Sequence, residues 1–219
     1  MSVVQNLKDI QGHIDAAAIA RGRKGQDVHL VAVSKKQPPA IIREAVDAGH
    51  RLFGENRVQE AREHWQDLRD EFPELRLHLI GPLQTNKVKE AVALFDVIET
   101  LDRPKLADAL SLEMKKQNKS LPCFIQVNTG DEDQKAGISV QELTDFHTYC
   151  LGQGLEVTGL MCIPPADEPP AMHFALLHKL AVQLNLKDLS MGMSGDYERA
   201  IALGATYVRL GTAIFGARD

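Results

Sequence analysis

The segment VRLGTAIFG, residues 208–216, combines a strand-like beginning with residue types that suit anion binding. Residues two apart in a strand point the same way, so Arg209 and Gly211 share one face and their neighbours share the other. Gly211 has no side chain to keep a ligand away, and Thr212 adds a hydroxyl where a helical turn with unpaired N–H groups begins. We therefore expect these three residues to line a binding site.

A second segment, LSMGMSGD at residues 189–196, ends in a similar way. A strand over 188–194 would place Ser194 at its end, on the same face as Ser190 and Gly192, with the two methionines packed on the other face. Gly195 and Asp196 then turn into a helix whose first N–H groups are unpaired. Together the two segments predict a cradle for a phosphate group.

Lys35 ends the first apolar segment, and its position suggests covalent chemistry. Burial at a strand end disfavours the charged ammonium group and lowers its pKa, which leaves an amine able to attack an aldehyde. Lys36 is the alternative, but neighbours on a strand face opposite sides, so at most one of the two points into a site. Two solvated lysines before Pro38 and Pro39 are the other interpretation. A reactive lysine beside a phosphate cradle indicates an aldehyde phosphate as the ligand.

The segments that must position these residues alternate between strand-like and helical composition. Eight strands are predicted over 29–34, 51–56, 75–81, 96–100, 122–128, 155–164, 188–194 and 207–211. Seven helical segments separate them, and a helix over 3–20 supplies the eighth. This pattern in 219 residues predicts an α/β fold, a single TIM-type (β/α)₈ barrel whose N-terminal helix completes the outer ring. We expect residues 1–219 to form one domain, with the proline-rich piece 163–170 as a loop.

In such barrels the site lies at the carboxyl ends of the strands, and the loops after strands seven and eight often hold phosphate. The two segments with the predicted cradle occupy those places. Polar residues also follow three other strands: Asn56 in FGEN, the run Gln84-Thr85-Asn86-Lys87, and Asn128.

Composition and charge exclude several classes of function. The net charge of −5 and the absence of a long basic block argue against a nucleic-acid partner. No run of about 18 apolar residues indicates a membrane span, and the first twenty residues do not resemble a signal peptide, so we expect a cytoplasmic protein. Cys123, Cys150 and Cys162 are predicted to be buried thiols. No HExxH motif occurs, and His173 and His178 do not share a helical face, so no metal site is predicted.

Five motifs together resemble the pyridoxal phosphate homeostasis family, and they span nearly the whole chain in collinear order. They are AVSK ending at Lys35, FGEN at 53–56, HLIGPLQTNK at 78–87, LSMGMSGD at 189–196 and VRLGTAIFGARD at 208–219. The resemblance implies a barrel like the N-terminal domain of alanine racemase. It also implies that pyridoxal 5′-phosphate (PLP) forms an internal Schiff base on Lys35.

The same resemblance assigns roles to the remaining residues of the expected site. Ser194, Gly211 and Thr212 would hold the phosphate, Arg209 would meet the pyridine nitrogen, and Asn56 completes the expected cofactor-binding set.

The chain also departs from the family pattern. Lys36 and Gln37 follow the motif lysine where many members have a different residue and then a second lysine, and Gly195 stands where some have an acid. The acidic loop 131–133, with Lys135, is placed near the barrel mouth by the resemblance.

The type of residue at the pyridine nitrogen bears on whether such a protein is an enzyme. PLP acts as an electron sink most strongly when a carboxylate keeps its ring nitrogen protonated, and Arg209 cannot accept that proton. Racemisation also needs a base on each face of the substrate. Three tyrosines could act as the second base, but packing is the expected role for Tyr149, Tyr197 and Tyr207.

Three functions remain open when these residues are taken together with the resemblance. We favour a monomeric PLP carrier without turnover, which passes PLP transiently to apo forms of PLP-dependent enzymes. A small amino-acid racemase and a PLP-free Schiff-base aldolase are the alternatives.

Overall fold

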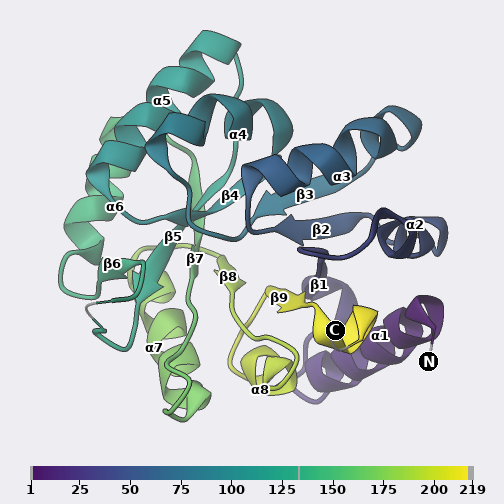
Figure 1. Ribbon diagram of the computed structural model, residues 1–219. Coiled ribbons are helices and arrows are strands. Elements are labelled where there is room, and N and C mark those ends of the chain that lie inside the picture. The colour runs from purple at the N-terminus through teal and green to yellow at the C-terminus, as the bar shows by residue number, and fades with distance from the viewer. Residues whose placement is uncertain (1, 133, 217–219) are drawn as a thin grey trace.

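Eight parallel strands form a closed barrel in the protein, whose computed structural model describes residues 2–132 and 134–216. Each strand pairs with its neighbours in the ring, and the β1–β9 and β4–β5 pairings close it (Figure 1). The predicted α/β barrel is therefore confirmed. Its strands are β1 (His29–Val33), β2 (Leu52–Glu55), β3 (Arg76–Leu79), β4 (Val97–Leu101), β5 (Cys123–Asn128), β7 (Val157–Met161), β8 (Asp188–Ser190) and β9 (Tyr207–Leu210).

Helices surround the barrel on all sides (Figure 1). They are α1 (Val3–Ile19), α2 (Pro39–Asp47), α3 (Val58–Glu71), α4 (Val88–Leu94), α5 (Pro104–Gln117), α6 (Leu143–Gly152), α7 (Pro170–Gln183), α8 (Tyr197–Ala202) and α9 (Thr212–Phe215), with short 3₁₀ turns η1 (Gly25–Asp27) and η2 (Thr85–Lys87). Within the described residues, no helix is long and apolar enough to cross a membrane.

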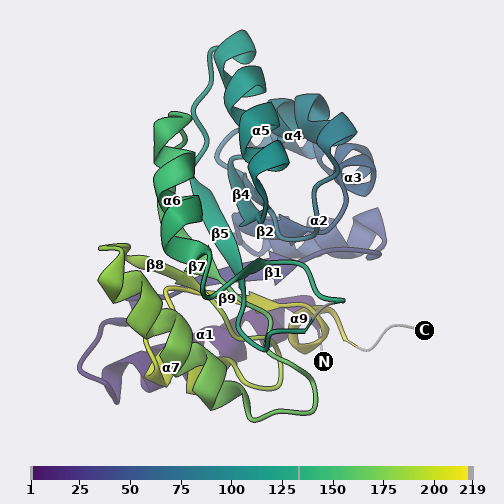
Figure 2. The same cartoon turned by 90° about the vertical axis from the view of Figure 1, so that its left-hand side faces the viewer.

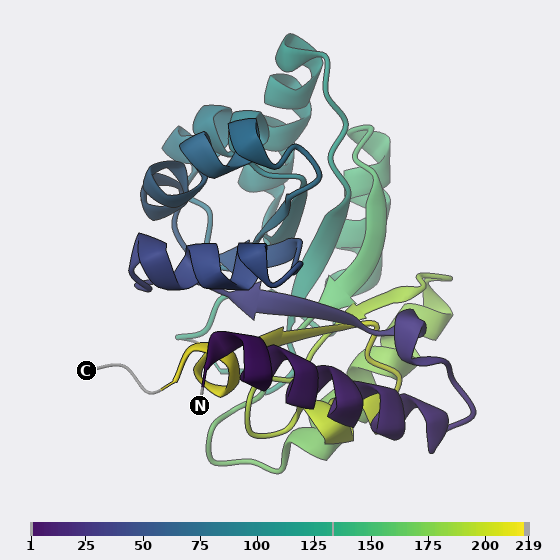
Figure 3. The same ribbon diagram turned by 90° about the vertical axis from the view of Figure 1, so that its right-hand side faces the viewer.

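The N-terminal helix completes the outer ring as the sequence predicts. Ser2 caps α1 by accepting a hydrogen bond from the Gln5 N–H at 3.3 Å, and the apolar face of the helix is buried. This helix packs between α2 and α8 and lies alongside α9, so the two ends of the described chain meet on one side of the barrel (Figure 3).

The main hydrophobic core lies between the barrel strands and these helices. The barrel interior differs because it contains polar side chains. Ser190 on β8 contacts Glu99 on β4, and these strands are not neighbours in the ring, so the contact crosses the interior. Gly54 leaves room for its neighbours, since a Cβ there would approach Val31 Cγ1 to 2.8 Å and Ile80 Cδ1 to 3.0 Å.

Two strands are shorter than predicted. The strand expected over 155–164 is β7, which ends at Met161, and the strand expected over 188–194 is β8, which ends at Ser190. Gly192 has a φ of +94°, a left-handed conformation that breaks the strand alternation. The predicted shared face of the two methionines is therefore wrong, because Met191 is buried and Met193 is exposed.

One further strand, β6 (Ile138–Ser139), was not predicted. It pairs with the end of β5 and lies outside the ring of eight; Figure 2 shows the α6 and α7 side of the barrel, where β5 runs.

Candidate functional site

One cavity of about 290 Å³ brings together all six residues expected to bind a cofactor. It opens at the carboxyl ends of β1, β2 and β9 and beside the loop after β8, the end of the barrel where the sequence placed the site. The six residues are Lys35, Asn56, Ser194, Arg209, Gly211 and Thr212. The remaining lining residues are Val33, Ile80, Ile163, Met193 and Gly195.

Lys35 reaches this cavity from a tight turn and not from the strand itself. The strand β1 ends at Val33, and the Gln37 N–H donates to the Ser34 carbonyl at 3.0 Å. Lys36, at the third position of this turn, has a φ of +59°, which is uncommon for a residue with a side chain. Lys36 is exposed and does not line the cavity. The prediction that only one of the two lysines points into the site is therefore correct, but its stated reason is wrong. The turn, and not strand alternation, directs Lys35 and Lys36 to different sides.

Two buried or half-buried carboxylates hold the turn on either side of Lys35. The Ser34 hydroxyl donates to Glu55 Oε1 at 2.7 Å, and the Lys36 N–H donates to Glu60 Oε1. Glu55, fully buried, also accepts from Trp65 Nε1 at 3.1 Å and lies 3.0 Å from His64 Nδ1.

Among the described residues, Glu55, Glu60 and His64 form the one group able to offer three metal ligands, with the ligand atoms within 4.8 Å of one another. The contacts of Glu55 and Glu60 with the turn, and of His64 with Glu55, account for the cluster without an ion. The sequence analysis missed this arrangement, although Glu55 lies within the FGEN motif.

Arg209 lines the cavity and is held there by groups from three other strands or their ends. Its Nη1 donates to the Ser190 hydroxyl at 2.6 Å, and its Nη2 donates to the Cys162 carbonyl at 2.9 Å. Glu99 Oε2 lies 3.9 Å from Nη1 and accepts from Ser190 at 2.5 Å. These contacts fix the plane of the guanidinium group. Only 4% of the Arg209 side chain is exposed.

Glu99 supplies the negative charge that this buried arginine needs. Its other oxygen, Oε1, lies 2.6 Å from His78 Nδ1. Burial alone would raise the pKa of Glu99, but the hydrogen bond and charge of His78, the charge of Arg209 and the Ser190 hydroxyl outweigh it and lower the pKa. The sequence analysis missed Glu99 and His78; the signal was a charged and a polar residue inside the otherwise apolar strands β4 and β3.

The expected phosphate end of the cavity is formed by Ser194, Gly211 and Thr212. The Ser194 Oγ accepts from the Ala213 N–H at 3.3 Å, and the Thr212 hydroxyl has no hydrogen-bond partner among the described residues. A Cβ at Gly211 would meet Val33 at ordinary contact distances of 3.4 Å or more, and a Cβ at Gly195 would meet nothing within 4 Å. Packing within the chain therefore does not require glycine at either position.

The α8 helix contributes less to this end than predicted. The Asp196 and Tyr197 N–H groups both donate to the Met193 carbonyl at 3.0 Å, and the Met193 N–H donates to Asp196 Oδ1 at 2.6 Å. The prediction of unpaired N–H groups at the beginning of α8 is wrong for these two residues.

The three tyrosines take packing roles and do not line the cavity. Tyr149 donates to Asp108 on the outside of the barrel, and the Tyr197 hydroxyl lies 3.2 Å from His13. Tyr207 stacks among aromatic rings at the start of β9, and burial, together with the charges of Asp188 and Glu99, raises its pKa to about 12.

Lys135 and His173, which the sequence analysis also considered, do not line the cavity. Lys135 pairs with Glu132 at 2.6 Å in the acidic loop, of which residue 133 is outside the described residues. His173 is buried and lies within 3.2 Å of Thr129 and 3.1 Å of Glu168.

Comparison with known proteins agrees with this geometry. Residues 7–219 match the family described as alanine racemase, N-terminal domain. Pyridoxal phosphate homeostasis proteins are similar over almost the full length: that of Escherichia coli is 39% identical, covering 99% of this chain and 97% of the relative, and that of Pasteurella multocida is 42% identical, covering 100% and 99%.

Solved structures show the same similarity. PipY of Synechococcus elongatus with PLP bound has 34% identity and a TM-score of 0.82, covering 98% of this chain and 100% of that chain. The structure of PipY without PLP has 35% identity, the same coverage and a TM-score of 0.86. An alanine racemase from Clostridium difficile shares only the fold, with 12% identity and a TM-score of 0.73, and this chain covers 57% of it.

Proposed function

This chain belongs to the pyridoxal phosphate homeostasis protein family, and from that premise we propose that it binds PLP through a Schiff base on Lys35 and takes part in PLP homeostasis without turnover of its own. One observation carries the proposal. A single cavity contains a lysine amine, a buried arginine and a hydroxyl-lined end with two glycines.

The dimensions and donors of the cavity fit PLP. Its volume of about 290 Å³ is close to the lower end of the range of about 300–1,000 Å³ typical of small-molecule sites. Gly211 and Gly195 leave space that the chain does not use, and the Thr212 hydroxyl has no protein partner among the described residues, as a phosphate site requires. Ser194, Gly211 and Thr212 would bind the phosphate, Asn56 would line the ring, and Arg209 would meet the pyridine nitrogen.

The environment of Arg209 supports a carrier over a racemase. PLP supplies an electron sink to enzymes, and the sink is strongest when the ring nitrogen carries a proton. Arg209 stays cationic and donates its hydrogen bonds, so it favours the unprotonated nitrogen. Among the described residues that line the cavity, Lys35 is the one side chain able to act as a base, whereas two-sided proton transfer needs two bases.

We further propose that residues 1–219 form one PLP-binding domain, that the protein works as a monomer in the cytoplasm, and that its partners are PLP and, transiently, apo forms of PLP-dependent enzymes. The coverage of the relatives over almost the whole chain supports the first part.

Borohydride reduction of the PLP-loaded protein tests the Schiff base. Peptide mapping should recover the pyridoxyl group on Lys35, and Lys35→Ala should remove the imine absorbance while the fold remains intact. Lys36→Ala is the matched control and should keep the absorbance. Recovery of the label on Lys36 or Lys135 alone would overturn the assignment.

Solvent deuterium exchange tests the absence of turnover. The loaded protein should leave L- and D-alanine unchanged and should activate an added apo enzyme by transferring PLP. Exchange of the α-hydrogen with racemisation at about 1 s⁻¹ or faster, a rate typical of enzymes, would contradict the carrier function.

A further inference from the structure

A second hollow, of about 640 Å³, opens beside the PLP cavity and shares Asn56 with it. Its walls come from the loop between β2 and α3, from the first turn of α3, from the loop after β3 and from the residue that precedes α5. The run Gln84-Thr85-Asn86-Lys87, which the PLP site does not use, contributes Gln84 and Lys87 to these walls.

The charge of this hollow is unusual for a chain with a net charge of −5. Three cationic side chains line it, from Arg57, Lys87 and Arg103, and no carboxylate is among the described residues of its lining. The amides of Gln59 and Gln84 add donors for anionic oxygens.

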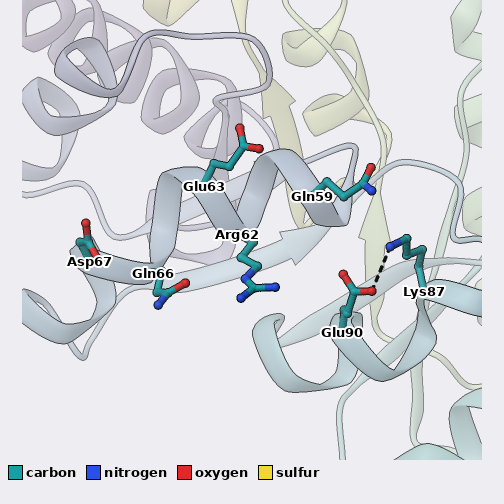
Figure 4. A pocket seen from close by; sticks show the side chains of 7 residues that line it. All are labelled: Gln59, Arg62, Glu63, Gln66, Asp67, Lys87 and Glu90. Carbon is teal, nitrogen blue, oxygen red and sulfur yellow. Dashed lines mark hydrogen bonds and ion pairs between the residues drawn. The ribbon is translucent and has the colours of Figure 1, made fainter.

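A neighbouring hollow between α3 and α4 provides the contrast. It has a similar volume of about 620 Å³, but Glu63, Asp67 and Glu90 line it together with Arg62 and Lys87. Figure 4 shows these side chains: Lys87 is bonded to Glu90, while Glu63 and Asp67 point from α3 to the side opposite Arg62. Lys87 therefore has its counter-charge, Glu90, within this neighbouring hollow, and two further carboxylates line it.

Two of the three cationic side chains in the hollow beside the PLP cavity form ion pairs with carboxylates that do not line that hollow. Lys87 donates to Glu90 at 2.9 Å, and Arg103 donates to Asp102 and, at 2.7 Å, to the Leu83 carbonyl. These bonds orient the two side chains. Arg57 makes no ion pair with any described residue, so its charge is not compensated within the described chain.

We propose that this hollow binds a small anion through Arg57, with Lys87, Arg103 and the two glutamine amides completing the site. The group it recognises is a carboxylate or a phosphate, because both match the planar donors of arginine. Binding of the anion does not depend on PLP. We expect this anion to be part of a molecule that reaches the neighbouring PLP cavity past Asn56, the residue that the two hollows share. This second step rests on the proposed function.

Nuclear magnetic resonance of the full-length protein tests this site. Inorganic phosphate and sodium acetate are titrated separately at constant ionic strength, with sodium chloride as the reference anion. Saturable shifts should occur at the side-chain amides of Gln59 and Gln84 and at Arg57 Nε–H. A response to phosphate alone identifies a phosphate site, and a response to both anions identifies a carboxylate-tolerant site. Equal shifts with chloride would overturn the proposal.

Charge-removing variants test the role of Arg57. Arg57→Gln should weaken binding of the effective anion by about tenfold or more, the loss expected for one charge-assisted hydrogen bond. Arg62→Gln is the matched control, because Arg62 lies on α3 five residues after Arg57, carries the same charge and does not line this hollow. It should leave the affinity unchanged, and equal losses in both variants would show non-specific attraction.

The same titration in Lys35→Ala protein separates this inference from the proposed function. Anion binding at Gln59 and Gln84 should persist there, since Lys35 does not line this hollow. If Lys35 forms no Schiff base yet the shifts saturate, the function fails and the anion site stands. If the shifts disappear with Lys35, the anion had occupied the PLP cavity and the inference is wrong.

Discussion

Glu55 and Glu99 are two fully buried carboxylates, each beside a histidine, in different regions of the barrel. Glu99 lies in the interior, where both of its oxygens have partners and the cation Arg209 is 3.9 Å away. Glu55 contacts α3, and its Oε1 collects three polar neighbours while its Oε2 has none.

The difference indicates two ways of supporting one cavity. Glu99 balances a permanent charge and so fixes the arginine expected at the ring nitrogen. Glu55 gathers donors and so fixes the turn that presents Lys35. The first region should therefore be sensitive to charge, and the second to hydrogen-bond geometry.

The largest effect is expected for Glu99→Gln. Removing one partner of a buried ion pair leaves Arg209 without a counter-charge and should lower the free energy of unfolding by about 3–5 kcal/mol. Urea denaturation measures this loss. A cost below that of Glu55→Gln would contradict the assignment of charge balance to Glu99.

Glu55→Gln should cost less, about 1–3 kcal/mol, because the amide keeps the shape but weakens bonds to Ser34, His64 and Trp65. The imine with PLP should form more weakly, since the turn carrying Lys35 loosens. Absorbance titration with PLP measures this, and Ser34→Ala, which removes one of the three bonds, should show a smaller loss. An unchanged PLP affinity in Glu55→Gln would separate the turn from ligand binding.

The two regions should respond to opposite ends of the pH range. The pKa of His64 is raised above 6.5, mainly by its hydrogen bond to Glu55. Burial opposes this shift, and the charges of Glu55, Glu60 and Glu63 add to it. The stabilisation by His64 is complete below 6.5 and is lost as pH rises through the folded-state pKa. The pKa of Glu99 is lowered from 4.5, so its stabilisation is present above 4.5 and is lost as pH falls.

Urea denaturation from pH 2.5 to pH 9 checks this behaviour. His64→Gln should flatten the alkaline side of the stability curve and leave the acid side unchanged. If His64→Gln also flattened the acid side of the stability curve, Glu55 and Glu99 would be coupled, and the two regions would not be independent.

The smallest effect is expected for Lys36→Gly. Glycine adopts the φ of +59° without steric cost, so the free energy of unfolding should rise by up to about 1 kcal/mol. Lys36→Ala keeps the conformational cost and should change little, and Lys36→Val should be destabilising. Thermal denaturation of the three variants measures the order, and a loss in Lys36→Gly would mean that the lysine side chain itself stabilises the turn.

The order of elements could be read from the sequence because each strand is a short apolar run separated from the next by a helical segment. The six residues of the expected site could be placed because parallel strands deliver their carboxyl ends to one mouth, as Lys35, Asn56 and Arg209 illustrate. Strand alternation failed where the chain leaves the sheet, at Lys36 and after Ser190, because positive φ values there redirect the side chains.

The groups that support the site could not be predicted in the same way. The pairing of Glu99 with Arg209 crosses the barrel between strands that are 110 residues apart in sequence, and the spacing of residues within one strand holds no information about it. Glu60 and His64 lie on a helix, and in the sequence they look like ordinary solvated residues. The fold places the Lys35 turn against Glu60 and the buried Glu55 against His64.

The three thiols have a practical consequence. Cys123, Cys150 and Cys162 are unpaired and buried, and burial is the main cause that raises the pKa of each to about 12. Almost no thiolate is then present at neutral pH, and thiolate is the form that alkylating reagents and peroxides attack. A cysteine engineered on the surface would consequently be the fast-reacting thiol, so a fluorophore could be attached beside the barrel mouth without first removing the native cysteines.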